Sequence, residues 1–476
     1  MAHQESAAVT TKGKADGKPV TFTYHRHANA NDSELSWEQD AAPVRRLAAQ
    51  DIVAVLHKRV QEADDLTVLY VENTVPDDKK EQVPGALETL VATKLPQPFS
   101  HDFLLPRDAY WQTHQAHAPG HPALHILVSV KSGTGKALDV WEHMLCPMLY
   151  ELEASDYMLH LTTSENSVTD LTRDTFLPQA NLGVAQTVIL LSGDGGMADL
   201  VNAILSEKRS KSYKKPTIVL LPLGTGNALA NSAGIAADNT MGLRTLLHGS
   251  PKELPLFRAT FSPGARLLVN ELRDERPLQK LNGTPVIHGA VVCSWGLHAS
   301  LVADSDSSKY RKFGAERFPM AAKDLLYPAD GAMPHPYKGR VSVLRPSTEG
   351  KGDDWEPIDR ETHGYVLATL VSQLEKGFTI SPMSRPLDGK LRLVHFGPLS
   401  GKGAMDVMTK AYDGGKHATD ERVGYEEVEG VKIHFEEEEA RWRRVCVDGK
   451  IVQVEAGGWV ALKSGIEGVV DLVVGP

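Results

Sequence analysis

The sequence predicts a mixed fold of the α/β plus β class, with an N-terminal β-rich module, an α/β domain built on a parallel sheet, and a C-terminal β-sandwich. From residue 125, apolar runs alternate with glycine loops and helix-like segments, a pattern typical of parallel sheets covered by helices. Beyond about residue 249, short β-type runs separated by turns replace this pattern. The chain has 476 residues, more than one hydrophobic core usually holds. The predicted domains are residues 1–118, 119–249 and 250–476.

Composition excludes several classes of protein. No apolar run approaches the roughly 18 residues that a membrane-spanning helix needs. The balance of 51 basic and 61 acidic residues argues against binding nucleic acid, or anionic lipid, through net charge. The 3 cysteines form no C-x-x-C motif, which argues against a disulfide framework or a cysteine zinc site and favours an intracellular setting. Residues 1–20 have no apolar segment of a secretory signal and are expected to form a disordered tail.

The N-terminal module is predicted from β-type runs between polar, proline-containing loops, and its residues indicate no chemistry. The predicted strands are residues 20–23, 51–56 and 66–71. Residues 114–122 are expected to form a linker to the α/β domain.

The α/β domain is predicted from strands that each lead into a loop and then a helix. The expected strands are residues 125–130, 157–161, 187–191 and 217–221, and the clearest helices are residues 137–152 and 197–205. Ligands of such sheets bind at the carboxyl ends of the strands, where all the glycine loops fall. The expected sandwich strands are residues 267–272, 286–293, 341–344, 365–371, 391–396, 431–435 and 445–447, with a helical insertion near residues 310–326.

Three glycine loops carry the candidate chemistry: the first loop (131–136), the second loop (192–196) and the third loop (222–227). In the second, Asp194 lies between glycines at the start of a helix, where unpaired N–H groups favour phosphate. The alternative is a tight turn with Asp194 as a helix cap. Leu229 stands where a Rossmann fingerprint needs its last glycine, and Ala137 where a Walker loop needs Ser or Thr. Together the loops predict a phosphate cradle.

These loops resemble the motifs of the diacylglycerol kinase catalytic domain family. The second loop and its helix, L-S-G-D-G-G-M-A-D-L-V-N-A-I-L, are similar to the family's G-D-G signature, and L-P-L-G-T-G-N-A-L-A is similar to its L-P-x-G-[ST]-G-N loop. The first loop resembles the S-G-x-G-K-A motif, and residues 161–166 resemble a nucleotide-contacting T-x-x-x-N segment. Residues 294–318 resemble the sphingosine kinase branch, with its W-G and K-Y-R motifs. Residues 1–118 lie outside the resemblance.

The resemblance implies a role for each matching residue. Asp194 would be the general base, and Asp304 would hold the amino and hydroxyl groups of a sphingoid substrate. The residues implied in nucleotide binding are Ser132, Gly133, Gly135, Lys136, Thr162, Ser192, Gly193, Gly195, Gly224, Thr225, Gly226, Asn227, Arg311, Arg317 and Asp448. Two of the departures from the family pattern are Asp199 and Lys450, which both stand where a Glu is usual.

The function expected from the resemblance is ATP-dependent phosphorylation of the primary hydroxyl of a sphingoid base, with Mg²⁺ bridging the ATP phosphates. A diacylglycerol or ceramide kinase, and a non-catalytic lipid-binding relative, remain as alternatives. The lipid tail is expected in the apolar interior of the β-sandwich. We expect a cytoplasmic protein bound peripherally to a membrane, with no nucleic-acid partner. The basic runs at residues 208–215 and 441–444 are candidate headgroup contacts, or solvated loops.

Overall fold

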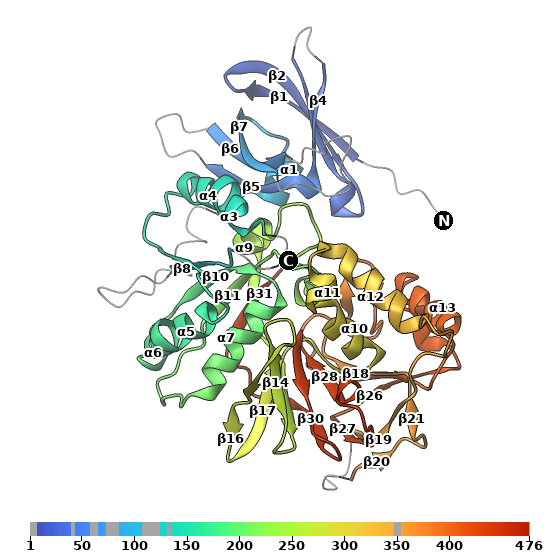
Figure 1. Cartoon of the computed structure of the whole chain (residues 1–476). Helices are drawn as coiled ribbons and strands as arrows, with labels where there is room; N and C mark the ends of the chain where they lie inside the picture. The colour runs from blue at the N-terminus through green and yellow to red at the C-terminus, as the bar shows by residue number, and fades with distance from the viewer. Residues whose placement is uncertain are drawn as a thin grey trace.

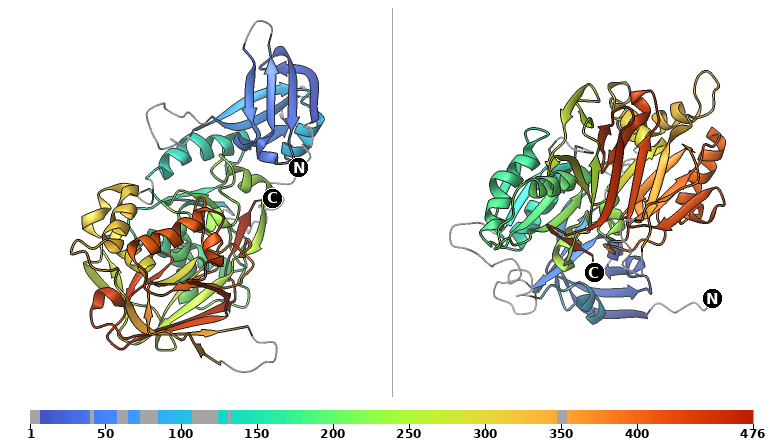
Figure 2. Two further views of the ribbon diagram at one scale, coloured as in Figure 1. Left: turned by 90° about the vertical axis from the view of Figure 1, so that its right-hand side faces the viewer. Right: turned by 90° about the horizontal axis from the view of Figure 1, so that it is seen from below.

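The computed structural model has a mixed α and β fold with several sheets, which confirms the coarse fold prediction (Figure 1). It describes residues 7–39, 43–57, 65–72, 85–106, 124–130, 133, 135–346 and 354–475. Figures 1 and 2 show the N-terminal sheet at one end, the parallel sheet with its helices next to it, and the C-terminal sheets at the other end. No helix of the described residues is long and apolar enough to cross a membrane.

The N-terminal module is one antiparallel sheet in the order β4-β3-β2-β1-β7-β6-β5. Its elements are β1 (Ala7–Ala15), β2 (Lys18–Arg26), β3 (Glu34–Glu38), β4 (Arg45–Ala48), β5 (Ile52–His57), β6 (Asp65–Glu72), β7 (Ala86–Thr93) and the helix α1 (Gln97–Phe103). The prediction of a disordered tail over residues 1–20 is wrong from residue 7 onward. The turn at Asp16 and Gly17, both with positive φ, joins β1 to β2 and lets β1 pair along its whole length.

The parallel sheet has the order β12-β31-β11-β10-β8-β9 and carries the glycine loops. Its strands are β8 (Leu124–Val128), β9 (Met158–Leu161), β10 (Thr187–Ser192), β11 (Thr217–Pro222), β12 (Ser250–Glu253) and β31 (Asp471–Val474). β31 runs parallel to β11, and β12 is antiparallel to β31. The end of the chain thus returns to this sheet, although the predicted boundary placed residues 250–476 in the sandwich.

Helices cover both faces of the parallel sheet. They are α3 (Ala137–Val140), η3 (Trp141–Leu145), α4 (Cys146–Glu151), α5 (Ser167–Leu171), η4 (Thr172–Phe176), α6 (Leu177–Asn181), α7 (Asp194–Ser206), α8 (Ala228–Ser232) and α9 (Leu243–His248). In β10, Leu190 packs in one core with α7, while Ile189 and Leu191 pack in the other with α4 and α9. This alternation follows from the period of two along a strand, and burial on both faces explains why the strand reads as a continuous apolar run.

Two sheets form the C-terminal part, in the orders β16-β17-β13-β30-β27-β19-β20 and β15-β14-β29-β28-β18-β22-β25-β26. The strands are β13 (Leu256–Phe261), β14 (Arg266–Val269), β15 (Asp274–Pro277), β16 (Lys280–Leu281), β17 (Thr284–Gly289), β18 (Val292–Gly296), β19 (Tyr337–Leu344), β20 (Glu356–Pro357), β22 (Tyr365–Thr369), β25 (Arg392–Phe396), β26 (Val423–Glu427), β27 (Gly430–Phe435), β28 (Arg444–Val447), β29 (Lys450–Gln453) and β30 (Trp459–Ile466). Buried side chains such as Phe257, Trp295 and Phe435 fill the space between the sheets.

Helices lie beside these sheets: α10 (Leu297–Ser305), α11 (Ser308–Arg311), α12 (Arg317–Leu326) and α13 (Gly401–Tyr412). α11 and α12 occupy the predicted helical insertion, whereas α10 and α13 were not predicted.

Arg244 of α9 joins the N-terminal module to the α/β domain. Its guanidinium donates to the carbonyl oxygens of Ala49 and Ile52 and lies 3.3 Å from the Asp238 carboxylate. Nearby, Asn239 donates to Asp51 at 2.7 Å. The module is therefore packed against the segment that follows the third loop.

Arg244→Ala should lower the free energy of unfolding by about 3 kcal/mol, because it leaves Asp238 and two carbonyl groups without their partner in a half-buried site. Urea denaturation of the variant and of Arg340→Ala, which removes a largely exposed arginine, measures this effect. Equal stability of the two variants would contradict it.

Candidate active site

The three glycine loops touch one another at the carboxyl ends of β8, β10 and β11. A Cβ atom at Gly133 would lie 2.1 Å from the carbonyl oxygen of Leu223, and one at Gly193 would lie 2.6 Å from Cα of Gly224. No larger residue fits at these positions. By contrast, a Cβ at Gly135 or Gly195 would meet no atom within 4 Å. The contacts bring the loops together, and the two open glycines leave room for a ligand to approach the backbone.

Asp194 is the first residue of α7, and its carboxylate binds the start of α8. Its oxygens accept hydrogen bonds from the backbone N–H groups of Ala228 at 2.7 Å and Leu229 at 3.1 Å. Burial raises the pKa of the Asp194 carboxyl, and the two backbone bonds act in the opposite direction. Asp194 therefore caps the helix after the third loop while it lies at the open face of the second.

Asn227 closes the third loop on itself. Its amide oxygen accepts from the N–H of Gly224 at 2.7 Å, and its amide nitrogen donates to the Gly224 carbonyl at 2.8 Å. The residue has a left-handed backbone with φ 51°, which Asn adopts more easily than most residues. These bonds give Asn227 a structural role, while Thr225 is exposed and Gly226 approaches the carbonyl oxygen of Leu374.

Ser132, in the first loop, lies outside the described residues. Gly133 and Gly135 have φ values of 57° and 73°, and Lys136 follows at the start of α3. The Thr162 hydroxyl accepts from the backbone N–H of Val130 at 3.0 Å, so it anchors the start of this loop. Ser192 is buried beneath the second loop, where a Cβ on Gly196 would clash with its hydroxyl.

Asp448 contacts the backbone between β17 and β18. Its carboxylate accepts from the N–H groups of Ala290 at 2.7 Å, Val291 at 3.1 Å and Val292 at 2.7 Å. Burial raises its pKa to about 7; the backbone bonds oppose this rise, and the negative charge of Asp194 adds to it. The charge of Asp194 thus affects the Asp448 carboxyl. The Asp448 oxygens themselves bind the backbone of the turn between β17 and β18.

Lys450 and Asp199, the two departures from the family pattern, form an ion pair with each other. The pair lies beside a cavity of about 300 Å³ that Asn166 and Asn202 also line. On its other side, Arg276 pairs with Glu165 at 2.7 Å. The sequence analysis found both departures but not their pairing, because it joins residues far apart in the chain.

Two arginine pairs surround the acidic residues of α10 and the segment after it. Arg311 and Arg317 approach the Asp306 carboxylate at 3.9 and 3.4 Å. The Asp304 carboxylate is paired with Arg441 at 2.6 Å and Arg444 at 3.1 Å. Asp306 was not among the predicted site residues.

The arginines of residues 441–444 make contacts within the protein, so this segment is not a freely solvated loop, and its contact with lipid headgroups stays a prediction. Arg441 and Arg444 hold Asp304, and the buried Arg443 donates to the carbonyl oxygens of Glu437 and Val454.

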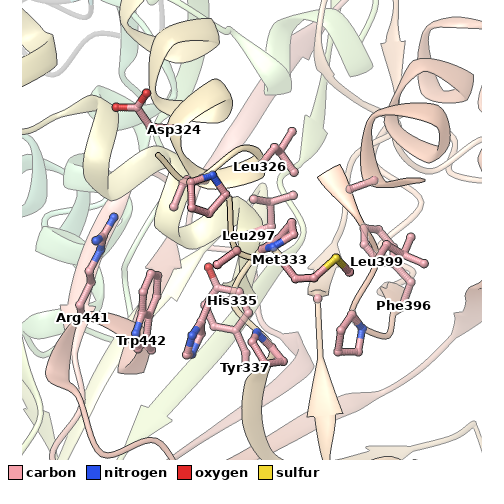
Figure 3. Close-up of a pocket in the computed structure, with 18 of the residues that line it drawn as sticks. Leu297, Asp324, Leu326, Met333, His335, Tyr337, Phe396, Leu399, Arg441 and Trp442 are labelled. Atoms are coloured by element: carbon pink, nitrogen blue, oxygen red, sulfur yellow. The ribbon is translucent and has the colours of Figure 1, made fainter. Parts of the chain in front are cut away.

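A cavity of about 320 Å³ with polar and apolar walls is lined in part by Arg441, the partner of Asp304 (Figure 3). Figure 3 shows Arg441 and Trp442 on one side and Phe396 and Leu399 on the other. Other apolar residues of the lining are Leu297, Leu325, Leu326, Met333 and Tyr337. This cavity lies beside α10, α12 and α13, within the C-terminal part of the chain. The entry of a lipid tail into this part of the chain stays a prediction.

Comparison with known proteins links these features to a family. Residues 123–259 match the family described as diacylglycerol kinase catalytic domain. Sphingosine kinase 1 of Homo sapiens is 26% identical over 296 residues, 57% of this chain and 71% of the relative. Sphingosine kinase 1 of Mus musculus is 25% identical over 314 residues, 61% of this chain and 76% of the relative. A solved structure described as a putative diacylglycerol kinase from Bacillus anthracis str. Sterne covers 75% of this chain and 99% of its own, at 14% identity and a TM-score of 0.48.

Gly193→Ala should lower the free energy of unfolding by about 1–3 kcal/mol, because its Cβ would overlap the backbone of Gly224. Gly195→Ala, in the first turn of α7 with open space around it, should leave stability unchanged or raise it by up to about 1 kcal/mol. Chemical denaturation of both variants tests the contact, and the idea fails if Gly193→Ala is as stable as wild type.

Asp448→Asn should change how stability depends on pH. A carboxyl whose folded pKa is about 7, against about 4 in the unfolded chain, contributes stability that is fully present below pH 4 and is lost as pH rises through 7. The variant lacks this titration. The free energy of unfolding of wild type, minus that of the variant, should therefore decrease between pH 5 and pH 8. Urea denaturation at several pH values measures this difference, and a constant value would refute the assignment.

Proposed function

The chain carries a diacylglycerol kinase catalytic domain of the sphingosine kinase branch, and from this premise we propose that it transfers the γ-phosphoryl group of ATP to the primary hydroxyl of a sphingoid base. Membership of a lipid kinase family implies the use of ATP and a lipid substrate. The observation that carries the proposal is the meeting of three glycine loops around Asp194, with open backbone at Gly135 and Gly195.

The loops suit the triphosphate of ATP. The N–H groups at the amino end of α7 are a place for phosphate oxygens, since the helix dipole favours negative charge there. Lys136, Arg311 and Arg317 would neutralise phosphate charge, and the Asn166 and Asn202 side chains line the neighbouring cavity of about 300 Å³. Mg²⁺ bound with ATP would neutralise the remaining charge on the phosphates.

Asp194 would accept the proton of the lipid hydroxyl as the hydroxyl oxygen attacks the γ-phosphorus. Its pKa is raised by burial, which makes the ionised carboxylate a stronger base than an exposed one. Its two hydrogen bonds to backbone N–H groups fix the position of the carboxylate oxygens. Only the substrate hydroxyl then has to be oriented for the reaction. We place the lipid tail against the apolar residues of the cavity of about 320 Å³ beside α12, such as Leu297, Leu326 and Phe396.

The pairing of Asp304 favours a second candidate, a kinase for a neutral lipid such as diacylglycerol or ceramide. The Asp304 carboxylate with Arg441 and Arg444 has a net charge of about +1, counting one negative and two positive groups. A cationic amine would have to compete with both arginines for this carboxylate, whereas a neutral headgroup would not.

We also propose that the protein works in the cytoplasm, bound peripherally to a membrane. Met333 of the cavity lining is 61% exposed, and Tyr327, which lies between the lining residues Leu326 and Pro328, is 52% exposed, so both could enter a lipid surface. The free thiols of Cys146, Cys293 and Cys446 agree with a reducing compartment.

Asp194→Asn should reduce phosphoryl transfer by about 10²–10⁴-fold, the usual contribution of a general base. The assay is transfer of labelled phosphate from Mg·ATP to sphingosine, diacylglycerol and ceramide. Asp174→Asn, which removes an exposed carboxylate of η4, is the matched control and should keep full activity.

The same assay with Asp304→Ala separates the candidates. Phosphoryl transfer that is confined to sphingosine and weakened by Asp304→Ala supports a sphingoid-base kinase. Transfer to neutral lipids that is the same in wild type and Asp304→Ala supports a neutral-lipid kinase. No transfer to any lipid by the wild-type chain would leave the non-catalytic relative.

A further inference from the structure

A separate cavity, of about 560 Å³, lies at the carboxyl end of α7. α7 begins at Asp194 and ends at Ser206, so this cavity is roughly 18 Å along the helix from the candidate base. The segment after α7, β13 and the β16–β17 hairpin border it. The labels of β16 and β17 stand at the lower left of Figure 1. The cavity is therefore distinct from the three glycine loops.

Three cationic side chains line this cavity: Arg209, Lys211 and Arg258. Glu207 and Glu467 lie on its rim. Arg209 approaches Glu467 at 3.4 Å, but Glu467 is 71% exposed, so this pair is weak. Within the part of the chain that the structure describes, neither Lys211 nor Arg258 forms an ion pair with a carboxylate. Three positive and two negative side chains thus give the lining a net charge of about +1. Lys211 and Arg258 carry the cationic groups without a carboxylate partner among the described residues.

Arg258 is held in place by a buried neighbour. Its Nε donates to Nε2 of His288, its cross-strand partner, at 3.3 Å. Burial, and the charge of Arg258, lower the pKa of His288 to about 4, so the ring is neutral and accepts this bond near pH 7. The described residues supply no acceptor for the terminal nitrogens of Arg258. These two nitrogens form the fork that pairs with phosphate or carboxylate oxygens.

His288 is in turn fixed to α7. The backbone N–H of His288 donates to the side-chain amide oxygen of Asn202 at 2.9 Å, and the backbone carbonyl oxygen of His288 accepts from the Asn202 amide nitrogen at 2.8 Å. Arg258 is thus supported by a network that reaches from β13 through β17 to the helix of Asp194. A guanidinium positioned in this way loses less conformational freedom when it binds an anion.

Part of the remaining lining is apolar or aromatic. Leu205, Leu281 and Tyr213 line the cavity. The Tyr213 hydroxyl donates a hydrogen bond to the carbonyl oxygen of Val469 at 2.6 Å. The Arg209 guanidinium lies over the Tyr213 ring at 5.6 Å. The volume is within the usual range of small-molecule sites and exceeds the needs of a bare phosphate ion.

We propose that this cavity binds a phosphate monoester, whose phosphate pairs with Arg258, Arg209 and Lys211 and whose organic part contacts Leu205, Leu281 and Tyr213. This assigns a function to part of the basic run at residues 208–215. The proposal concerns binding alone and does not depend on the kinase activity.

Two probes test it on the full chain: glycerol 3-phosphate in solution, and phosphatidylcholine vesicles with or without phosphatidic acid. Calorimetry and vesicle sedimentation measure binding to wild type, Arg258→Ala, Lys211→Ala and the control Arg340→Ala, whose arginine is exposed and paired with Glu436. Arg258→Ala and Lys211→Ala should each weaken binding about tenfold or more, and Arg340→Ala should not. Lys211 is exposed, so its variant will fold even if Arg258→Ala does not.

Loss of glycerol 3-phosphate binding in both cavity variants identifies a soluble ligand. The same loss seen only with phosphatidic acid vesicles identifies a lipid headgroup. The proposal is overturned if wild type binds neither probe, or if binding survives unchanged in both cavity variants, as it would if the phosphate bound only at the glycine loops.

Discussion

The close approach of Gly193 and Gly224 is the constraint on which the candidate active site depends. A Cβ on either residue would lie within 2.7 Å of the Cα of the other, so this approach requires glycine on both sides. It brings Asp194 within hydrogen-bond distance of the first amides of α8. A single backbone contact thus positions the candidate base and leaves an open face beside it. Packing of the strands beneath, which are buried along their length, keeps the loops in register.

α7 connects this site to the C-terminal sheets. Asp194 lies at its amino end, Asp199 pairs with Lys450 of β29, and Asn202 binds the backbone of β17. The second glycine loop, the cavity beside Lys450 and the cavity at Arg258 therefore all border one helix. The ion pair of Asp199 with Lys450 joins α7 to β29 beside the cavity of about 300 Å³.

The parts of this fold that the sequence predicts are those with local signals. The glycine loops were found because Gly, Asp and Asn follow buried apolar strands at short, fixed spacing. Partners distant in sequence have no such signal: β31 joins β11 across more than two hundred residues, and Asp304 finds Arg441 and Arg444 more than a hundred residues away. The strand β1 was missed because small and polar residues conceal its pairing with β2. Asp448 was found by resemblance, yet only the structure shows that backbone amides take up its oxygens.

The central claim, that the three loops form one phosphate cradle, can be tested by hydrogen–deuterium exchange of the full chain with and without a non-hydrolysable ATP analogue and Mg²⁺. We expect slower exchange in all three loops together, at residues 130–136, 192–196 and 223–229, with an unchanged rate in the N-terminal sheet. Protection of only one loop, or protection confined to other parts of the chain, would contradict the account.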